Sequence, residues 1–324
     1  MKKGTGISWA TVYLWDGTRL PGETWNGLGG CRRVSRECSN CYAIVVAHNR
    51  LSGPGQRYAG LTRMVKGKPD WTGHVALFPD KLDLPLRWTT PRGIFVNSMS
   101  DVFHIEVPVR YIQAIFEVLA NSPHVGQILT KRPERMAALM PELWRARDLA
   151  LPGVLADAGI ESPAVTRALA QGRLRPLGDF DGPPPNIWLG TSIGENAAAY
   201  RADYLAATPA AVRFISAEPL IGPVDRVNLA GIHQVITGGE SGEGHRPFDP
   251  AWAEEMRALC ARTGVAFYHK QGGGRTARAS GDLLNGVRYR QYPAVFPDGH
   301  VGVYDASHID PHADEDDIPR IQAV

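Results

Sequence analysis

The chain has 324 residues, 44% of them hydrophobic, and its 35 basic and 33 acidic residues leave a formal charge of +2. This length allows one large α/β core or two smaller ones, and the balanced charge excludes a generally polybasic protein, so nucleic-acid binding would need a local patch. Four cysteines, three of them crowded together, exclude a secreted disulfide framework and predict a cytoplasmic protein. No apolar leader follows the first six residues, and no apolar run is long enough to span a bilayer, so we expect no membrane association.

Three cysteines, Cys31, Cys38 and Cys41, lie within eleven residues of one another. Three soft thiolates on one loop predict a metal or iron–sulfur site. Glycines precede the loop and arginines lie within it, where positive charge favours thiolates and an anionic cluster. The alternative is a zinc knuckle completed by His48 or Cys260, although Cys260 falls within a predicted helix and is better interpreted as a buried, inert thiol.

Residues 31–68 are locally basic and carry aromatic residues among or beside the cations. Such a mixture suits a phosphate backbone and its bases, and an ordinary solvated face is the alternative. The residues concerned are Arg32, Arg33, Arg36, Arg50, Arg57, Arg63, Lys66 and Lys68, with Tyr42, Tyr58 and Trp71.

The rest of the chain repeats one pattern: a short apolar run, a cluster of small polar residues, and a helical stretch. Continuous apolar runs are typical of strands buried on both faces of a parallel sheet. They predict strands at 94–96, 125–129, 187–189, 212–215, 235–236 and 265–268, in addition to one strand before the cysteines. Asp249 and Pro250 predict the start of a helix, and Gly264 predicts its end.

These elements predict an α/β fold with one catalytic domain over residues 1–304, a complete or partial (β/α) barrel. A helical insertion is expected at about 133–185 and an acidic surface tail at 305–324. A doubly wound open sheet is the second possibility, because the pattern does not decide whether the sheet closes. In a barrel, the polar residues after the strands meet at the mouth formed by the carboxyl ends.

Polar residues after the strands are therefore the candidate ligand contacts. Exposed amides, hydroxyls and carboxylates suit a ligand with amino, carboxylate or ribose groups, and a helix cap, a tight turn or a salt bridge is the alternative for each. The candidates for cofactor contact are Asn97, Asp101, Thr191, Ser192, Glu218, Gly238, Gly239, Glu240 and Ser241.

Three cations at strand ends are candidates for contact with the substrate. Lys131, Arg132 and Lys270 suit a phosphate or a carboxylate, and a solvated surface role is the alternative. His104, in the same part of the chain, is interpreted as a structural histidine rather than a ligand.

Several of these phrases, in this order, resemble the phage Gp37/Gp68-like family of three-cysteine-motif proteins, a DUF5131-type family. The resemblance runs from about residue 24 to about 293, and the ordered set is more specific than any one phrase. The phrases include Cys38-Ser39-Asn40-Cys41-Tyr42-Ala43, Asn97-Ser98-Met99-Ser100-Asp101, Leu129-Thr130-Lys131-Arg132-Pro133-Glu134-Arg135, Glu218-Pro219-Leu220 and Gly238-Gly239-Glu240-Ser241-Gly242.

Members of this family look like divergent relatives of radical S-adenosylmethionine (SAM) enzymes. The resemblance implies a radical SAM-type barrel and a [4Fe-4S] cluster on Cys31, Cys38 and Cys41, with one iron left for SAM. The cysteine motif of this chain departs from the usual radical SAM pattern in two ways. The gap between its first two cysteines is longer, at six residues, and the aromatic residue Tyr42 follows the last cysteine rather than preceding it. The Gly-Gly-Glu segment, at Gly238, also lies late in this chain.

The function that the resemblance implies is generation of a 5′-deoxyadenosyl radical, supplied with an electron by a donor such as a flavodoxin or a ferredoxin. The implied substrate is nucleic acid, for example an amino-acid-modified (glycinyl) thymine isomerised during hypermodification of phage DNA in the host cytoplasm. Such a base would have to leave the helical stack. A lyase that repairs DNA lesions is a variant, and a zinc-stapled nucleic-acid-binding protein without radical chemistry is the alternative from another class.

Overall fold

The computed structural model describes residues 7–276 and 279–309. Its centre is a seven-stranded parallel sheet in the order β13-β12-β11-β10-β9-β8-β3. All seven predicted strands are confirmed. Their bounds are β3 (Gly22–Trp25), β8 (Gly93–Val96), β9 (Val125–Thr130), β10 (Ile187–Ser192), β11 (Val212–Ala217), β12 (Gln234–Gly238) and β13 (Ala266–Gln271).

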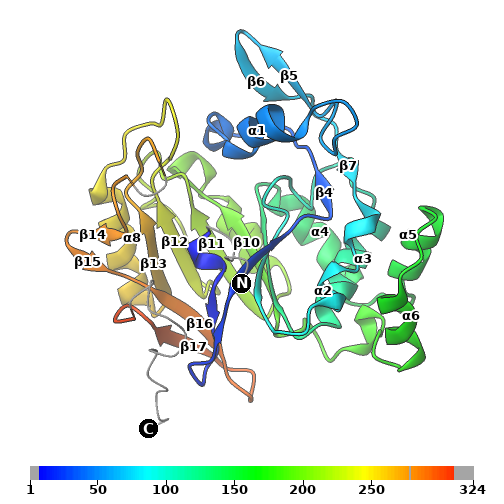
Figure 1. Cartoon of the computed structure of the whole chain (residues 1–324). Coiled ribbons are helices and arrows are strands. Elements are labelled where there is room, and N and C mark those ends of the chain that lie inside the picture. The colour runs from blue at the N-terminus through cyan, green and yellow to red at the C-terminus, as the bar shows by residue number, and fades with distance from the viewer. Residues whose placement is uncertain (1–6, 277–278, 310–324) are drawn as a thin grey trace.

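The sheet is a curled half barrel, as Figure 1 shows. Its strands are neighbours in the order in which they occur in the chain, without the reversal of strand order that defines a doubly wound sheet. The two edge strands, β3 and β13, are not paired with each other in the described part of the chain. The partial barrel is therefore the correct version of the predicted fold, and the complete barrel and the doubly wound sheet are wrong.

Helices cover the outer face of the sheet. Between consecutive strands lie α3 (Val109–Ala120), α4 (Pro133–Leu143), α7 (Arg201–Ala207) and α8 (Pro250–Thr263). The predicted limits of α8 are confirmed, because the Asp249 side chain accepts a hydrogen bond from the Ala251 amide and Gly264 has a φ of +72°. No helix in residues 7–276 and 279–309 combines the length and apolar character needed to cross a bilayer.

The expected helical insertion contains three helices rather than one extended region. After α4 come α5 (Leu151–Asp157) and α6 (Pro163–Ala170), which lie at the flank of the molecule beyond α3 (Figure 1). The α5 helix begins where the buried carboxylate of Glu117, on α3, accepts hydrogen bonds from the amides of Ala150 and Leu151. These hydrogen bonds attach the start of α5 to the outer helical layer, whereas α4 begins directly after the end of β9.

The inner face of the sheet is covered by the two ends of the described chain. Trp188 and Phe214 project from the sheet into a core completed by Trp9 and by Tyr292 of the hairpin β16 (Gln291–Val295) and β17 (Val301–Asp305). Residue Ala306 follows this hairpin and is 1% exposed. Ala306 and Ile309, which fall in the segment assigned above to a surface tail, thus belong to the inner core, whereas Asp305 and His308 are exposed. The acidic residues of 310–324 and the first six residues lie outside the described chain.

A separate small unit, which we call the cap, comprises residues 30–78. It contains α1 (Tyr42–Val46), the hairpin β5 (Thr62–Val65) and β6 (Lys68–Trp71), and β7 (Ala76–Leu77), which pairs with β4 (Leu28–Gly29). A hydrophobic cluster of its own holds the cap together, and Cys31 and Cys41 pack against it. Figure 1 shows α1 and the β5–β6 hairpin above the ends of the sheet strands, so the cysteines belong to a unit that covers one end of the half barrel.

The remaining short elements connect these parts. They are β1 (Val12–Tyr13), β2 (Arg19–Leu20), α2 (Leu84–Arg87), β14 (Leu283–Leu284) and β15 (Val287–Arg288).

We predict that Gly190→Ala destabilises the fold by about 1–3 kcal/mol, because it overpacks the inner core. A Cβ atom at Gly190 would lie 2.5 Å from Cζ of Phe214, which is fully buried. Urea denaturation of Gly190→Ala, Phe214→Leu and the double variant measures the effect. The double variant should lose less stability than the sum of the single losses. Additive losses, or no loss from Gly190→Ala, would contradict this packing.

Candidate functional site

A cavity of about 240 Å³ lies where the cap meets the carboxyl ends of the strands. The strand ends, the cysteine loop and the aromatic residues of the inner core all contribute to its wall. Thirteen of the fifteen site residues predicted from the sequence line this cavity: Cys31, Cys38, Cys41, Asn97, Asp101, Lys131, Arg132, Ser192, Glu218, Gly239, Glu240, Ser241 and Lys270.

The two other predicted residues, Thr191 and Gly238, support the wall without lining it. Thr191 is fully buried, and its hydroxyl donates a hydrogen bond of 2.9 Å to the Thr130 carbonyl. A Cβ atom at Gly238 would lie 2.7 Å from Oε1 of Glu218, so the glycine leaves room for that carboxylate. Both residues shape the strand ends.

Part of the cavity wall is aromatic and was not predicted. Trp9, from the N-terminal segment, lies 4.6 Å from Phe95 of β8 between ring centroids, and both residues line the cavity. Nothing in the local sequence connects Trp9 with a strand end more than eighty residues away. One side of the cavity is therefore apolar, whereas the strand ends and the cap supply its polar groups.

The three cysteines of the loop are free and partly buried. Burial raises the pKa of the Cys31 thiol to about 12, and a further contribution comes from the charge of Asp101. Burial also raises the pKa of Cys41, against the opposing effect of the Ala43 and Ile44 amides at the start of α1. Because thiolates rather than thiols bind a metal, burial of both groups opposes the ionisation that metal binding requires, and binding would depend on pH.

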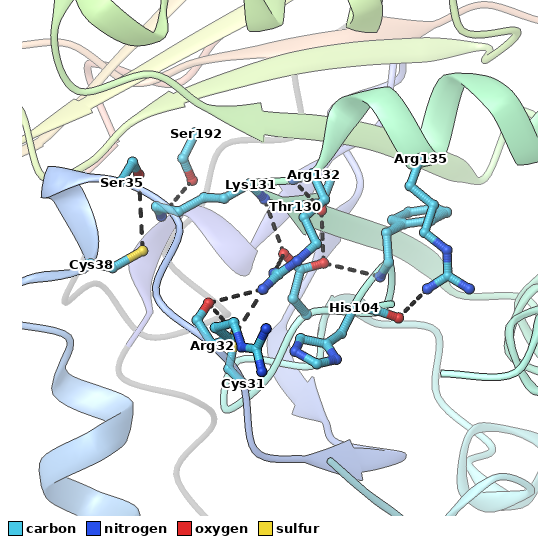
Figure 2. A network of polar contacts seen from close by, with 12 residues as sticks. Cys31, Arg32, Ser35, Cys38, His104, Thr130, Lys131, Arg132, Arg135 and Ser192 are labelled. Atoms are coloured by element: carbon cyan, nitrogen blue, oxygen red, sulfur yellow. Dashed lines mark hydrogen bonds and ion pairs between the residues drawn. The ribbon is translucent and has the colours of Figure 1, made fainter. Parts of the chain in front are cut away.

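Arg132 joins the cysteine loop to the end of β9 (Figure 2). Its guanidinium donates to the Asp101 carboxylate at 2.7 Å and to the Arg32 carbonyl at 2.9 Å, and lies 3.8 Å from the Cys31 sulfur. The Asp101 carboxylate also accepts hydrogen bonds from the Thr130 hydroxyl at 2.7 Å, the Phe103 amide at 3.0 Å and the Lys131 amide at 3.1 Å. Asp101 and Arg132, predicted as ligand contacts, are thus already bound to each other.

Lys131 points to the opposite side of the same network. Its ammonium donates a hydrogen bond of 3.0 Å to the Ser192 hydroxyl, as Figure 2 shows. It forms no ion pair with a carboxylate of the described chain. Burial raises the pKa of Cys41, and the charge of Lys131 offsets part of that rise. Two consecutive residues at the end of β9 therefore place positive charge beside two different cysteines.

Glu218 and Lys270 form an ion pair of 2.8 Å across the ends of β11 and β13. The second carboxylate oxygen of Glu218 accepts a hydrogen bond of 3.3 Å from the Ser216 hydroxyl. Both residues of the pair line the cavity, so a ligand there meets a paired rather than an isolated charge.

Glu240 fastens the cysteine loop to the end of β12. Its carboxylate accepts hydrogen bonds from the Asn40 amide at 2.8 Å and from the Arg246 guanidinium at 2.6 Å. Arg246 in turn donates to the Arg36 carbonyl at 2.9 Å. Although burial opposes it, these hydrogen bonds from Arg246 and Asn40 hold the pKa of Glu240 below its usual range. This carboxylate, predicted to contact a ligand, lines the cavity and also holds the loop that carries Cys38 and Cys41.

The polar cluster after β8 also holds chain segments together. The Asn97 side chain accepts hydrogen bonds from the Gly27 amide at 2.9 Å and the Leu28 amide at 3.3 Å, and the Ser100 hydroxyl donates to the Leu28 carbonyl at 3.1 Å. His104 is buried, and its Nδ1 accepts a hydrogen bond of 3.3 Å from the Glu106 amide. The hydrogen bonds of Asn97 and Ser100 thus hold the segment at Gly27 and Leu28, which leads into the cap.

A buried ion pair between Glu37 and Arg201 was missed in the sequence. Glu37 precedes Cys38, and its carboxylate lies 3.3 Å from the Arg201 guanidinium on α7, with both residues 3% exposed. It also accepts a hydrogen bond of 3.2 Å from the Gly194 amide. Burial opposes ionisation, but hydrogen bonding by Ser35 and the charge of Arg201 keep the pKa of Glu37 below its usual value. The signal was the single acid in an arginine-rich loop.

The two residues considered as a fourth ligand of a zinc knuckle have other surroundings. Cys260 is fully buried in the outer core, and the His48 Nδ1 forms a hydrogen bond of 3.0 Å with the Thr62 hydroxyl. Within the described residues, no three His, Cys, Asp or Glu side chains are close enough to share one metal ion. A polynuclear cluster differs from a single ion in that each thiolate binds a different iron.

We predict that Glu37→Ala destabilises the protein by about 3–5 kcal/mol, because it leaves the buried Arg201 charge without a counter-ion, although its hydrogen bond to the Ser192 carbonyl remains. The double change Glu37→Met with Arg201→Met should cost less, because it removes both charges. Asp179→Ala is the matched control: it breaks the exposed pair with Arg147 and should cost about 1 kcal/mol or less. Urea denaturation measures all three, and equal losses for Glu37→Ala and Asp179→Ala would contradict the role of the pair.

The same pair should contribute to acid sensitivity. Because the folded pKa of Glu37 lies below its ordinary value of 4.5, its stabilisation is present above that pH and is lost as the pH falls through the folded pKa. The wild type should therefore lose more stability below about pH 4.5 than the Glu37→Met, Arg201→Met protein. Parallel pH profiles from thermal melting would show that Glu37 contributes nothing to acid sensitivity.

Comparison with protein families gives one match, over residues 17–293, to the family DUF5131, which is described as proteins of unknown function. No curated protein and no solved structure matches the chain. The matched region contains the whole parallel sheet, the cap and all fifteen site residues predicted from the sequence, whereas Trp9 of the cavity wall precedes it. It agrees with the family resemblance noted in the sequence, and the chain belongs to the DUF5131 family.

Proposed function

We propose that this protein is a radical SAM-type enzyme that holds a [4Fe-4S] cluster on Cys31, Cys38 and Cys41. The observation that carries the proposal is the convergence of these cysteines on one cavity at the carboxyl ends of a parallel half barrel. Three thiols with no fourth cysteine nearby would leave one iron free for another ligand. Carboxyl ends of barrel strands are also the usual place for catalysis in such folds.

The proposed cofactors would supply a 5′-deoxyadenosyl radical, which removes a hydrogen atom from the substrate. The chain's own residues bind and orient the cofactors and the substrate, and they exclude water from the cavity. Cys31, Cys38 and Cys41 are the cluster ligands, and Ser192, Gly239 and Ser241 offer polar contacts to SAM. Trp9 and Phe95 form an apolar side of the cavity, which keeps water from a reactive radical.

Charge around the cysteines also supports the proposal. Arg132 beside Cys31 and Lys131 near Cys41 place two cations next to thiols that would bear negative charge when bound to iron. Nearby positive charge stabilises thiolates and an anionic cluster. For the reaction itself, we propose hydrogen abstraction from a nucleic-acid substrate, such as the rearrangement of an amino-acid-modified thymine in phage DNA. Repair of a DNA lesion by the same radical is a variant.

We predict that protein purified without oxygen contains iron and sulfide and, once reduced by dithionite, cleaves SAM to 5′-deoxyadenosine. Cys31→Ala, Cys38→Ala and Cys41→Ala should each abolish the cluster and the cleavage, because each removes one cluster ligand. Elemental analysis, the visible absorption spectrum and chromatography of the nucleoside product measure these outcomes.

Cys260→Ala is the matched control, since this cysteine is buried in the outer core, and it should keep both cluster and cleavage. Stoichiometric zinc in a colourless protein without SAM cleavage would instead support the zinc-stapled protein. Loss of the cluster in Cys260→Ala would show a four-cysteine site with no iron free for SAM.

We further predict that Lys131→Met lowers the midpoint potential of the cluster, because reduction adds negative charge that the ammonium stabilises. Lys131 is a better position for this test than Arg132, because replacing Arg132 would also leave the buried Asp101 carboxylate without its counter-ion. Redox titration followed by electron paramagnetic resonance measures the potential, and iron analysis checks that the cluster is retained. Arg145→Met is the control: this exposed arginine follows α4 and pairs with Glu142, so its loss should leave the potential unchanged. Equal potentials in wild type and Lys131→Met would contradict the role of Lys131.

A further inference from the structure

Positive charge is concentrated in the cap. Residues 30–78 contain eight Lys and Arg but only two acidic residues, whereas the whole chain has 35 basic and 33 acidic residues. The rest of the chain is therefore net acidic. Such segregation in a protein with an overall charge of +2 marks the cap as a surface for a polyanion.

Five of these eight cations remain exposed without a partner. Three of the eight form ion pairs at 2.7–2.8 Å: Arg33 with Asp70, Arg36 with Glu195, and Arg57 with Asp80. The other five form no ion pair within the described residues, and their charges are available to a partner. They are Arg32, Arg50, Arg63, Lys66 and Lys68.

Three of these cations belong to the β5–β6 hairpin, which projects beyond α1 (Figure 1). Lys66 and Gly67 form its two-residue turn with φ values of +49° and +77°, as in a type I′ turn. At the base of the hairpin, Trp71 and Leu61 are each 6% exposed in the cap's core. The hairpin is thus anchored at its base and presents charge along its length.

The register of the hairpin places its charges on the side of the cysteine loop. Arg63 is paired with Asp70, and Val65 with Lys68, so these side chains share one face. Asp70 on that face contacts Arg33 of the cysteine loop at 2.7 Å. Arg63 and Lys68 therefore lie on the face turned toward the loop that borders the cavity.

We propose that the cap binds the phosphate backbone of a nucleic acid and presents one nucleotide to the cavity. Tyr42, Ile44 and Trp71 of the cap also line the cavity, so a strand held on the cap lies next to its mouth. Placing the base in the cavity rests on the proposed function, and the base must leave the stack to enter. Phosphate binding by the cap requires neither cluster nor SAM.

An anionic membrane is the competing partner for a basic hairpin. The hairpin exposes Met64 and Val65 at 55% and 39%, but these two residues lie on opposite faces. They form no continuous apolar surface of the kind that inserts into lipid. Cations spread along a projecting arm instead suit the repeated charges of a phosphate backbone.

The test compares two triple variants of the full chain by fluorescence anisotropy, without SAM or reductant. The hairpin variant combines Arg63→Gln, Lys66→Asn and Lys68→Gln. Asparagine replaces Lys66 because that position has a positive φ, which asparagine tolerates. The matched control, Arg167→Gln, Arg173→Gln, Arg262→Gln, removes the same charge from exposed residues outside the cap. The probes are a labelled DNA duplex, a single DNA strand, an RNA strand, and vesicles of phosphatidylserine and phosphatidylcholine.

The hairpin variant should bind polynucleotide about tenfold or more weakly than wild type at about 100 mM salt, with a salt slope smaller by about 2–3. The control variant should bind within about twofold of wild type, and unchanged thermal melting confirms that both are folded. Binding to DNA or to RNA supports the proposal, and the affinities for the duplex, the single DNA strand and the RNA strand show which of them the cap prefers. No polynucleotide binding, equal losses in both variants, or binding to vesicles alone would overturn it.

These outcomes are independent of the radical chemistry. If the cap binds polynucleotide but the protein does not cleave SAM, the proposed function fails and the phosphate surface stands. If the protein cleaves SAM but the hairpin variant binds polynucleotide as tightly as wild type, the phosphate surface fails and the proposed function stands.

Discussion

Asp101 joins three parts of the molecule that are far apart in the sequence. Its carboxylate follows β8, accepts hydrogen bonds from Thr130 and the Lys131 amide at the end of β9, and pairs with Arg132. Arg132 then contacts Cys31 and the backbone beside it. A buried carboxylate is tolerated only when its oxygens are satisfied, so this acid, these strand ends and the cysteine loop take up their positions together.

The half barrel also explains why this cavity lies at the carboxyl ends of the strands. A parallel sheet must be covered on both faces, and here helices cover the outer face. The inner face, which a closed barrel fills with its own side chains, is filled by Trp9 and by Tyr292 of the C-terminal hairpin. The space between these segments and the cap remains at the carboxyl ends of the strands, beside Cys31, Cys38 and Cys41.

The sequence was informative where the signal was local and silent where it depended on distant pairing. Apolar runs located the strands, Asp249 and Gly264 located a helix, and the polar strand ends gave most of the cavity wall. Their partners were not predictable, because Glu240 meets Asn40 only after two hundred residues of chain have folded. Thr191 was misplaced for another reason: neighbouring residues of a strand face opposite sides, and one step decides which side lines the cavity.

The central claim is that three cysteines hold a cluster whose remaining iron binds SAM. Electron paramagnetic resonance of the reduced protein, recorded before and after addition of SAM, tests it most directly. The account predicts the signal of a reduced [4Fe-4S] cluster whose g values change when SAM is added, because SAM becomes a ligand of one iron. A spectrum without an iron–sulfur signal, or one that SAM leaves unchanged, would contradict the account.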